Sequence, residues 1–159
     1  MSRIVPNLWF DTQAEEAAQH YIAALGDGKI TQVMHYGPNT PRPEGTVMTV
    51  TFELFGQTFT GINGGPEFTF NEAMSLEVIC QDQEELDRVW AALVTGGEPG
   101  PCGWLKDKYG VSWQVVPSRL YDLLEGDDKA GAQRAMQVML ATDREPFDIA
   151  ELEAAYTGA

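Results

Sequence analysis

The side chains best suited to chemistry stand at alternating positions of two predicted strands. Ser75 and Glu77 share one side of a strand over residues 73–80, and Ser112 and Gln114 share one side of a strand within residues 102–117. A carboxylate whose pKa is raised by burial can act as a general base. Glu77 is therefore the best catalytic candidate, with Gln114 or Ser112 as its hydrogen-bond partner. Such a set would suit an isomerase or lyase that acts on a small carbonyl compound.

The same alternation gives the predicted strands over residues 46–55 and 57–62 one apolar and one polar face. Two interpretations remain open, because an antiparallel sheet can simply expose one side to water or can curve around a cleft. Trp104 could offer a stacking surface in such a cleft. The predicted cleft residues are Thr49, Thr51, Glu53, Thr58, Thr60, Ser75, Glu77, Trp104, Ser112 and Gln114.

A hairpin is predicted around the turn Asp107–Gly110, which separates two short runs of aromatic and β-branched residues. In the second run, Val111, Trp113 and Val115 point one way, and Ser112, Gln114 and Val116 point the other. The first set is suited to a core. Gln114 would then face the cleft, whereas Trp113 would not.

Several familiar site motifs are missing from the sequence. It contains no GxxxxGK, GxGxxG or GxSxG pattern, and its two histidines, His20 and His35, stand on a predicted helix and a predicted strand. A methyltransferase that uses S-adenosylmethionine would need a larger parallel sheet with a glycine-rich first loop. Cys80 and Cys102 have neither a zinc-site nor a disulfide-framework spacing, so both are expected to be thiols.

The net charge of −14 over 159 residues disfavours nucleic acids and anionic membrane surfaces as partners. The same charge gives high solubility and leaves a cationic ligand as an alternative. The chain has no run of 18 apolar residues, and its N-terminus lacks the features of a signal peptide. A cytoplasmic location is the resulting expectation.

The order strand–helix–strands occurs twice, which predicts tandem modules over residues 3–65 and 70–117. A strand from Ile4 precedes a helix over residues 13–25, for which Thr12 and Glu15 form a potential capping box. Asp82 and Glu85 suggest a similar start for the helix ending at Val94. A helical tail over residues 118–159 follows, and its methionine-bearing stripe is typical of a core or a dimer interface.

The chain resembles the PhnB-like family, whose members are often described as 3-demethylubiquinone-9 3-methyltransferase domains. The resemblance rests on Phe10-Asp11, on His20-Tyr21, on the Gly56-Gln57 turn leading to 62–65, and above all on residues 102–117; residues 147–156 of the tail are also similar. The family lies in the vicinal-oxygen-chelate superfamily, with glyoxalase I, extradiol dioxygenases and bleomycin-resistance proteins. The resemblance implies an α+β fold with two βαβββ modules whose mixed sheet curls around a cleft. It also implies a single domain over 1–159 and a homodimer.

The resemblance also tests for a metal site. Metal-binding members take ligands from the first and last strands of each module, which here correspond to Pro6, Thr60, Ser75 and Gln114. Only Gln114 is a plausible oxygen donor, so no metal and no cofactor are expected. The first hypothesis is therefore a metal-free small-molecule-binding protein. The alternative is an enzyme: an isomerase or lyase using Glu77, a metal-dependent glyoxalase or dioxygenase, or the methyltransferase of the family description.

Overall fold

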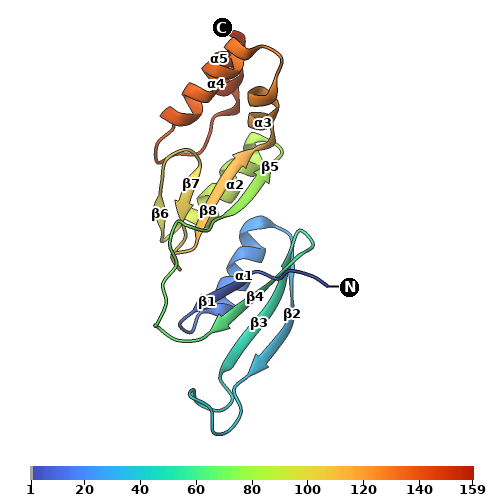
Figure 1. Ribbon diagram of the computed structural model, residues 1–159, viewed down its shortest axis with the longest axis vertical. Helices are drawn as coiled ribbons and strands as arrows, with labels where there is room; N and C mark the ends of the chain where they lie inside the picture. The colour runs from blue at the N-terminus through green and yellow to red at the C-terminus, as the bar shows by residue number, and fades with distance from the viewer. Residues whose placement is uncertain (1) are drawn as a thin grey trace. The chain divides into compact units, whose positions relative to one another are not determined.

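The computed structural model describes residues 2–159, which form two compact units, one ending at Phe70 and one spanning Asn71–Ala159. Each unit contains one strand, one helix and three further strands in that order, and three more helices complete the second unit (Figure 1). The predicted α+β class, with tandem βαβββ modules and C-terminal helices, is therefore confirmed. Among residues 2–159, no helix combines the length and apolar character needed to cross a membrane.

The first unit is a four-stranded mixed sheet with the strand order β1-β4-β3-β2. Strands β1 and β4 are parallel, and the other neighbours are antiparallel. The first strand begins at Asn7 rather than at the predicted Ile4, and Pro6 before it has no N–H to give to a ladder. The elements are β1 (Asn7–Phe10), α1 (Ala14–Leu25), β2 (Lys29–His35), β3 (Val47–Leu54) and β4 (Gln57–Asn63).

Helix α1 packs against one face of this sheet through the predicted apolar stripe. Ala17, Tyr21, Ala24 and Leu25 are all buried, as are the alternate β3 residues that include Phe52. The opposite face of β3 and β4 carries the threonines. Alternation thus separates a core face from an open face in the first unit, as expected from the pleat of a strand.

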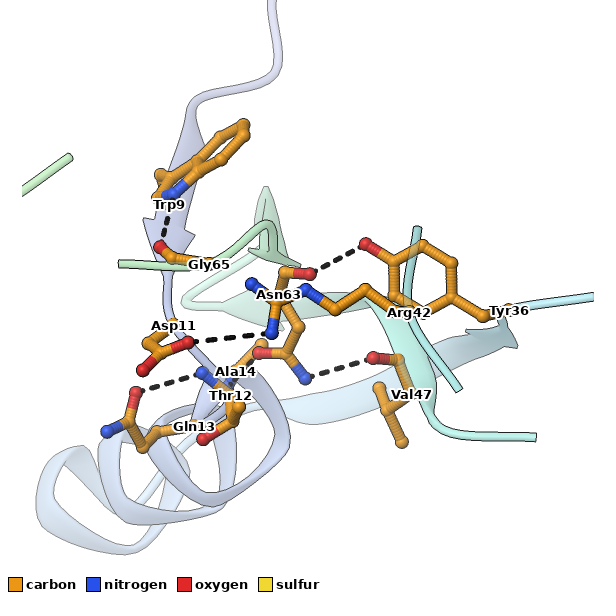
Figure 2. A network of polar contacts seen from close by, with 10 residues as sticks. All are labelled: Trp9, Asp11, Thr12, Gln13, Ala14, Tyr36, Arg42, Val47, Asn63 and Gly65. Atoms are coloured by element: carbon orange, nitrogen blue, oxygen red, sulfur yellow. Dashed lines mark hydrogen bonds and ion pairs between the residues drawn. The ribbon is translucent and has the colours of Figure 1, made fainter. Parts of the chain in front are cut away.

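The start of α1 differs from the prediction. The capping residue is Gln13, whose side chain makes no capping hydrogen bond to the helix, so the Thr12 capping box is wrong. Instead, the buried Asn63 side chain at the end of β4 accepts a hydrogen bond from Ala14 N at 2.8 Å and donates one to Val47 O at 3.1 Å (Figure 2). One amide therefore caps the helix and ties it to two strands.

Two side chains from the segment after β2, Tyr36 and Arg42, lie beside the same amide in Figure 2. Tyr36 donates its hydroxyl proton to Asn63 O at 2.7 Å, and Arg42 forms an ion pair with Asp11 at 3.7 Å. Trp9 donates from Nε1 to Gly65 O at 2.8 Å. These contacts give the side chains around Asn63 a structural role.

Replacing Asn63 with alanine is expected to destabilise the first unit by about 2 kcal/mol, because the buried Ala14 N–H and the partly buried Val47 carbonyl lose their partner. Urea unfolding monitored by tryptophan fluorescence would measure the loss. Asn7→Ala is the matched control, since the Asn7 side chain is exposed and donates a hydrogen bond to the nearby Val5 O. Equal unfolding midpoints for the two variants would contradict the capping role.

The second unit repeats the arrangement with the strand order β5-β8-β7-β6, in which only β5 and β8 are parallel. Its first strand begins at Leu76, three residues after the predicted start. In helix α2 the predicted stripe of Leu86, Val89, Trp90 and Leu93 is buried, and the side chain of Asp82 accepts a hydrogen bond from Glu85 N, as predicted. The elements are β5 (Leu76–Cys80), α2 (Gln83–Val94), β6 (Glu98–Pro99), β7 (Trp104–Lys106) and β8 (Ser112–Pro117).

The turn of the β7–β8 hairpin is built around Asp107, a carboxylate with only 3% of its surface exposed. Asp107 Oδ1 accepts hydrogen bonds from Tyr109 N at 2.8 Å and Val111 N at 3.0 Å. Its Oδ2 accepts one from Trp113 Nε1 at 2.9 Å. The side chain therefore shapes the turn and fixes the buried Trp113 ring, which lies on the core face as predicted.

The tail forms α3 (Ser118–Glu125), α4 (Lys129–Ala141) and α5 (Ile149–Thr157), and the predicted cap at Asp148 is present. Gln83 in α2 holds the segment before α5: it donates to Phe147 O at 2.8 Å and accepts from Ile149 N at 2.9 Å. The Phe147 ring is buried and lies against Gly103, where a Cβ atom would come within 2.5 Å of it. The tail is thus an integral part of the second unit.

Candidate functional site

The open face of the second sheet gathers the polar residues predicted there. Strand register places Gln114 of β8 between Glu77 of β5 and Trp104 of β7, and it places Ser112 directly opposite Lys106. Successive side chains of a strand alternate between faces, so all five residues share the side opposite the buried Trp113. The register of the hairpin therefore assembles the face that the sequence predicted.

A pocket of about 390 Å³ opens within this unit. Two of the predicted residues, Trp104 and Ser112, line it, whereas Glu77 and Gln114 do not. Its wall combines apolar side chains with an acidic and basic rim. The lining residues are Glu72, Glu98, Pro99, Gly100, Pro101, Trp104, Leu105, Lys106 and Ser112.

Ser112 is the unusual member of this pocket. Only 1% of its surface is exposed, and its Oγ has no hydrogen-bond partner among residues 2–159. A buried hydroxyl without a partner costs about 1 to 3 kcal/mol of desolvation free energy. Native structures leave few such groups, so this one requires an explanation.

The rim contains an ion pair that the sequence analysis missed. Lys106 Nζ contacts the Glu72 carboxylate, and this hydrogen bond raises the pKa of Lys106 and lowers the pKa of Glu72. Glu98 lies opposite Lys106 in the register. Lys106 could have been found from its spacing of two from Trp104, but Glu72 lies in a connecting segment and carries no periodic signal.

Glu77, the predicted general base, is exposed, so the burial on which that prediction depended is absent. Its carboxylate accepts a hydrogen bond from the Tyr121 hydroxyl of α3. This bond, with a smaller effect from partial burial, raises the pKa of Tyr121 to about 12. Tyr121 thus stays protonated at neutral pH and acts as a donor to Glu77.

The contact with Glu77 predicts that Tyr121 ionises at a higher pH than an ordinary tyrosine. In an absorbance titration, the difference between the wild-type protein and Tyr121→Phe should show a midpoint near 12 rather than the ordinary 10. Glu77→Gln removes the negative charge, so the Tyr121 midpoint should then fall toward 10. An unchanged midpoint in Glu77→Gln would contradict the contact.

The side chains that correspond to superfamily metal ligands do not fit a metal. In the second unit, Gln114 Nε2 donates to Ser75 Oγ at 2.9 Å, so the two candidate donors are paired with each other. In the first unit, the corresponding residues are Pro6 and Thr60, which offer no imidazole or carboxylate. Over residues 2–159, no group of three or more His, Cys, Asp or Glu side chains is placed to hold a metal ion.

The predicted cleft residues of the first unit share the open face of their own sheet. Thr51 lies opposite Thr60, and Glu53 lies opposite Thr58 in the register of β3 and β4. Glu53 also pairs with Lys29 at 3.3 Å. None of these residues lines the 390 Å³ pocket, and neither does Thr49. Their role in a ligand cleft stays a prediction.

The two thiols differ in their surroundings. Cys80 is buried, and desolvation raises its pKa to about 12, so it remains a protonated thiol at neutral pH. Cys102 is half-buried at the start of the β7 hairpin. Both cysteines are free, as the sequence predicted.

The chain matches a family model and is similar to several solved structures. A family model described as 3-demethylubiquinone-9 3-methyltransferase matches residues 2–116. The chain is similar to a PhnB protein from Bacillus cereus, with 39% identity, coverage of 74% of this chain and 100% of that chain, and a TM-score of 0.66. A protein from Pseudomonas aeruginosa is 23% identical, with 74% and 98% coverage and a TM-score of 0.60.

A glyoxalase/bleomycin resistance protein from Albidiferax ferrireducens is 16% identical, with 70% and 95% coverage and a TM-score of 0.43. A comparison with curated proteins found no match. The matched family region stops at residue 116, so α3, α4 and α5 lie beyond it.

Proposed function

Because the chain belongs to the 3-demethylubiquinone-9 3-methyltransferase (PhnB-like) family and forms two βαβββ units, we propose that it binds a small organic molecule without a metal. The binding site of this proposal is the open face of the second sheet, centred on the 390 Å³ pocket. That volume lies in the range of small-molecule sites, about 300 to 1,000 Å³.

The observation that carries the proposal is the buried hydroxyl of Ser112. Ser112 lines the pocket, and its hydroxyl lacks a hydrogen-bond partner among the described residues. A ligand that formed a hydrogen bond with this hydroxyl would offset the desolvation free energy of leaving it unpaired. Trp104 adds an aromatic surface to the same pocket, and aromatic rings bind flat ligands with favourable geometry.

The proposal includes neither a metal nor methyl transfer. The residues at the superfamily ligand positions offer no imidazole or carboxylate, and the one plausible oxygen donor, Gln114, is hydrogen-bonded to Ser75. The family description includes a methyltransferase activity. Each sheet here has four strands with mostly antiparallel pairing, which differs from the parallel sheet and glycine-rich loop that commonly hold a nucleotide-like cofactor.

A fragment screen by nuclear magnetic resonance would test the proposal. Ligands should shift the amide signals of the pocket residues and the Trp104 Nε1 signal, and Trp104→Ala should weaken binding about tenfold by removing the aromatic wall. Gln137→Ala, on α4 outside this pocket, is the control. Ligands that never perturb pocket signals would overturn the proposal, and so would one bound metal equivalent, found by elemental analysis and needed for ligand binding.

An enzyme remains the second candidate because Glu77 and Tyr121 place a carboxylate beside a hydroxyl on the open face. Here the fate of the bound compound distinguishes the two functions. Recovery of unchanged ligand favours a binding protein. Conversion of the ligand, abolished by Glu77→Gln while binding persists, would instead favour an enzyme in which Glu77 transfers a proton.

We also propose a homodimer in the cytoplasm. Leu140 and Met136 of α4 are exposed apolar residues, with 62% and 37% of their surfaces accessible, and could pack against a second copy. The two free thiols suit a reducing compartment. Light scattering on the wild type and on Leu140→Glu would test the dimer, which should dissociate in the variant.

A further inference from the structure

The chemistry of the pocket identifies a class of ligand. Resting on the binding function proposed above, we infer that the pocket takes a neutral, mostly apolar molecule with one hydrogen-bonding oxygen, which pairs with Ser112 Oγ. The net charge of −14 alone would favour a cationic ligand. Three features of the pocket instead support a neutral one.

The first feature is the state of the charged rim. Lys106 is already paired with Glu72, and this contact raises the pKa of one partner and lowers that of the other. An anionic ligand would have to compete with Glu72 for Lys106, with Glu98 lying opposite that lysine. The negative charge of the whole chain opposes an anion further.

The second feature is the exposure of the remaining acid. Glu98 lies on the two-residue strand β6 and is exposed to water. Ion pairs at exposed positions contribute little to binding, because water and salt screen them and the side chains lose freedom. A ligand ammonium would therefore gain little from Glu98.

The third feature is the contrast between the interior and the rim. Pro99, Pro101 and Trp104 supply apolar surface, and burying apolar ligand area against them is favourable. Ser112 is the polar group whose hydrogen bond would be made away from water. A hydroxyl both donates and accepts, so the ligand oxygen can belong to a carbonyl or to an alcohol.

Four matched aromatic probes test the inference: acetophenone, ethylbenzene, benzylamine and benzoate. They have similar apolar bodies and differ in carrying a neutral oxygen, no polar group, a cation or an anion. Titrations followed by amide signals of the pocket should give the tightest binding for acetophenone, about fivefold to tenfold tighter than ethylbenzene. Raising the salt concentration should leave the acetophenone affinity unchanged.

The variant Ser112→Ala isolates the hydroxyl. It should weaken acetophenone about fivefold to tenfold and leave ethylbenzene unchanged, which removes the difference between the two probes. Ser118→Ala, at the start of α3 and outside the pocket, is the control and should preserve the difference.

The outcomes separate the ligand class from the binding function. Tighter pocket binding by benzylamine or benzoate would overturn the neutral class while supporting a small-molecule site. Equal affinities of acetophenone and ethylbenzene for the wild type would remove Ser112 from recognition. If none of the four probes perturbs the pocket signals, both the inference and the proposed binding function are overturned.

Discussion

Replacing Asp107 with alanine is expected to destabilise the second unit by about 3 kcal/mol, because two backbone amides and the Trp113 indole lose their acceptor. The carboxylate is almost fully buried, so water cannot readily take over these bonds. Thermal unfolding should show a decrease in melting temperature of about 12 to 24 °C for a unit of this size.

Two controls sharpen the Asp107 experiment. Asp107→Asn keeps one acceptor oxygen and turns the other atom into a donor, so its destabilisation should be smaller than that of the alanine variant. Asp127→Ala removes an exposed acid from the same unit and should have little effect. If Asp107→Ala unfolded at the wild-type temperature, the turn would not depend on this carboxylate.

Phe147→Ala should be comparably disruptive, with an expected loss of about 3 kcal/mol from a fully buried aromatic ring. The variant leaves a cavity beside Gly103. The backbone around residue 147 would keep its hydrogen bonds to Gln83 but would lose the packing of the ring. Denaturant unfolding of the full chain measures the loss. Gln133→Ala removes an exposed side chain of the same tail and serves as the control.

The result for Phe147 bears on the role of the tail. An unchanged unfolding midpoint would show that the helices beyond the family match are an attachment that the second unit does not need. The expected loss would instead make the tail part of that unit's core. Limited proteolysis of Phe147→Ala should then cut within residues 118–159 first.

Much of the fold could be predicted because local patterns specify it. Alternation assigned Trp113 to the core and Gln114 to the open face, and the apolar spacing of Tyr21 and Leu25 located one helix stripe. These signals depend on the fixed periods of strands and helices. The predicted first residues of the strands are less accurate, because a strand begins where its pairing with a neighbouring strand begins.

Other features depend on residues distant in the sequence. The cap of α1 comes from Asn63, 49 positions after Ala14, and no local pattern connects them. The face of Ser112 was predicted, but the absence of a partner for its hydroxyl among the described residues depends on how the pocket packs around it. Glu77 illustrates the same limit, because its contact with Tyr121 spans 44 positions.

The two hydrogen bonds of Gln83, to Phe147 O and from Ile149 N, affect the order in which the two units can fold during synthesis. The first unit has all its strands once Asn63 has been made, whereas Gln83 must wait for Phe147 and Ile149, 64 and 66 positions later. Domains made first generally fold first. Chains stopped at Pro117 should therefore contain a protease-resistant first unit and a protease-sensitive second one. The second unit would remain unfinished, with its apolar surface open to other molecules, until Phe147 and Ile149 have left the ribosome.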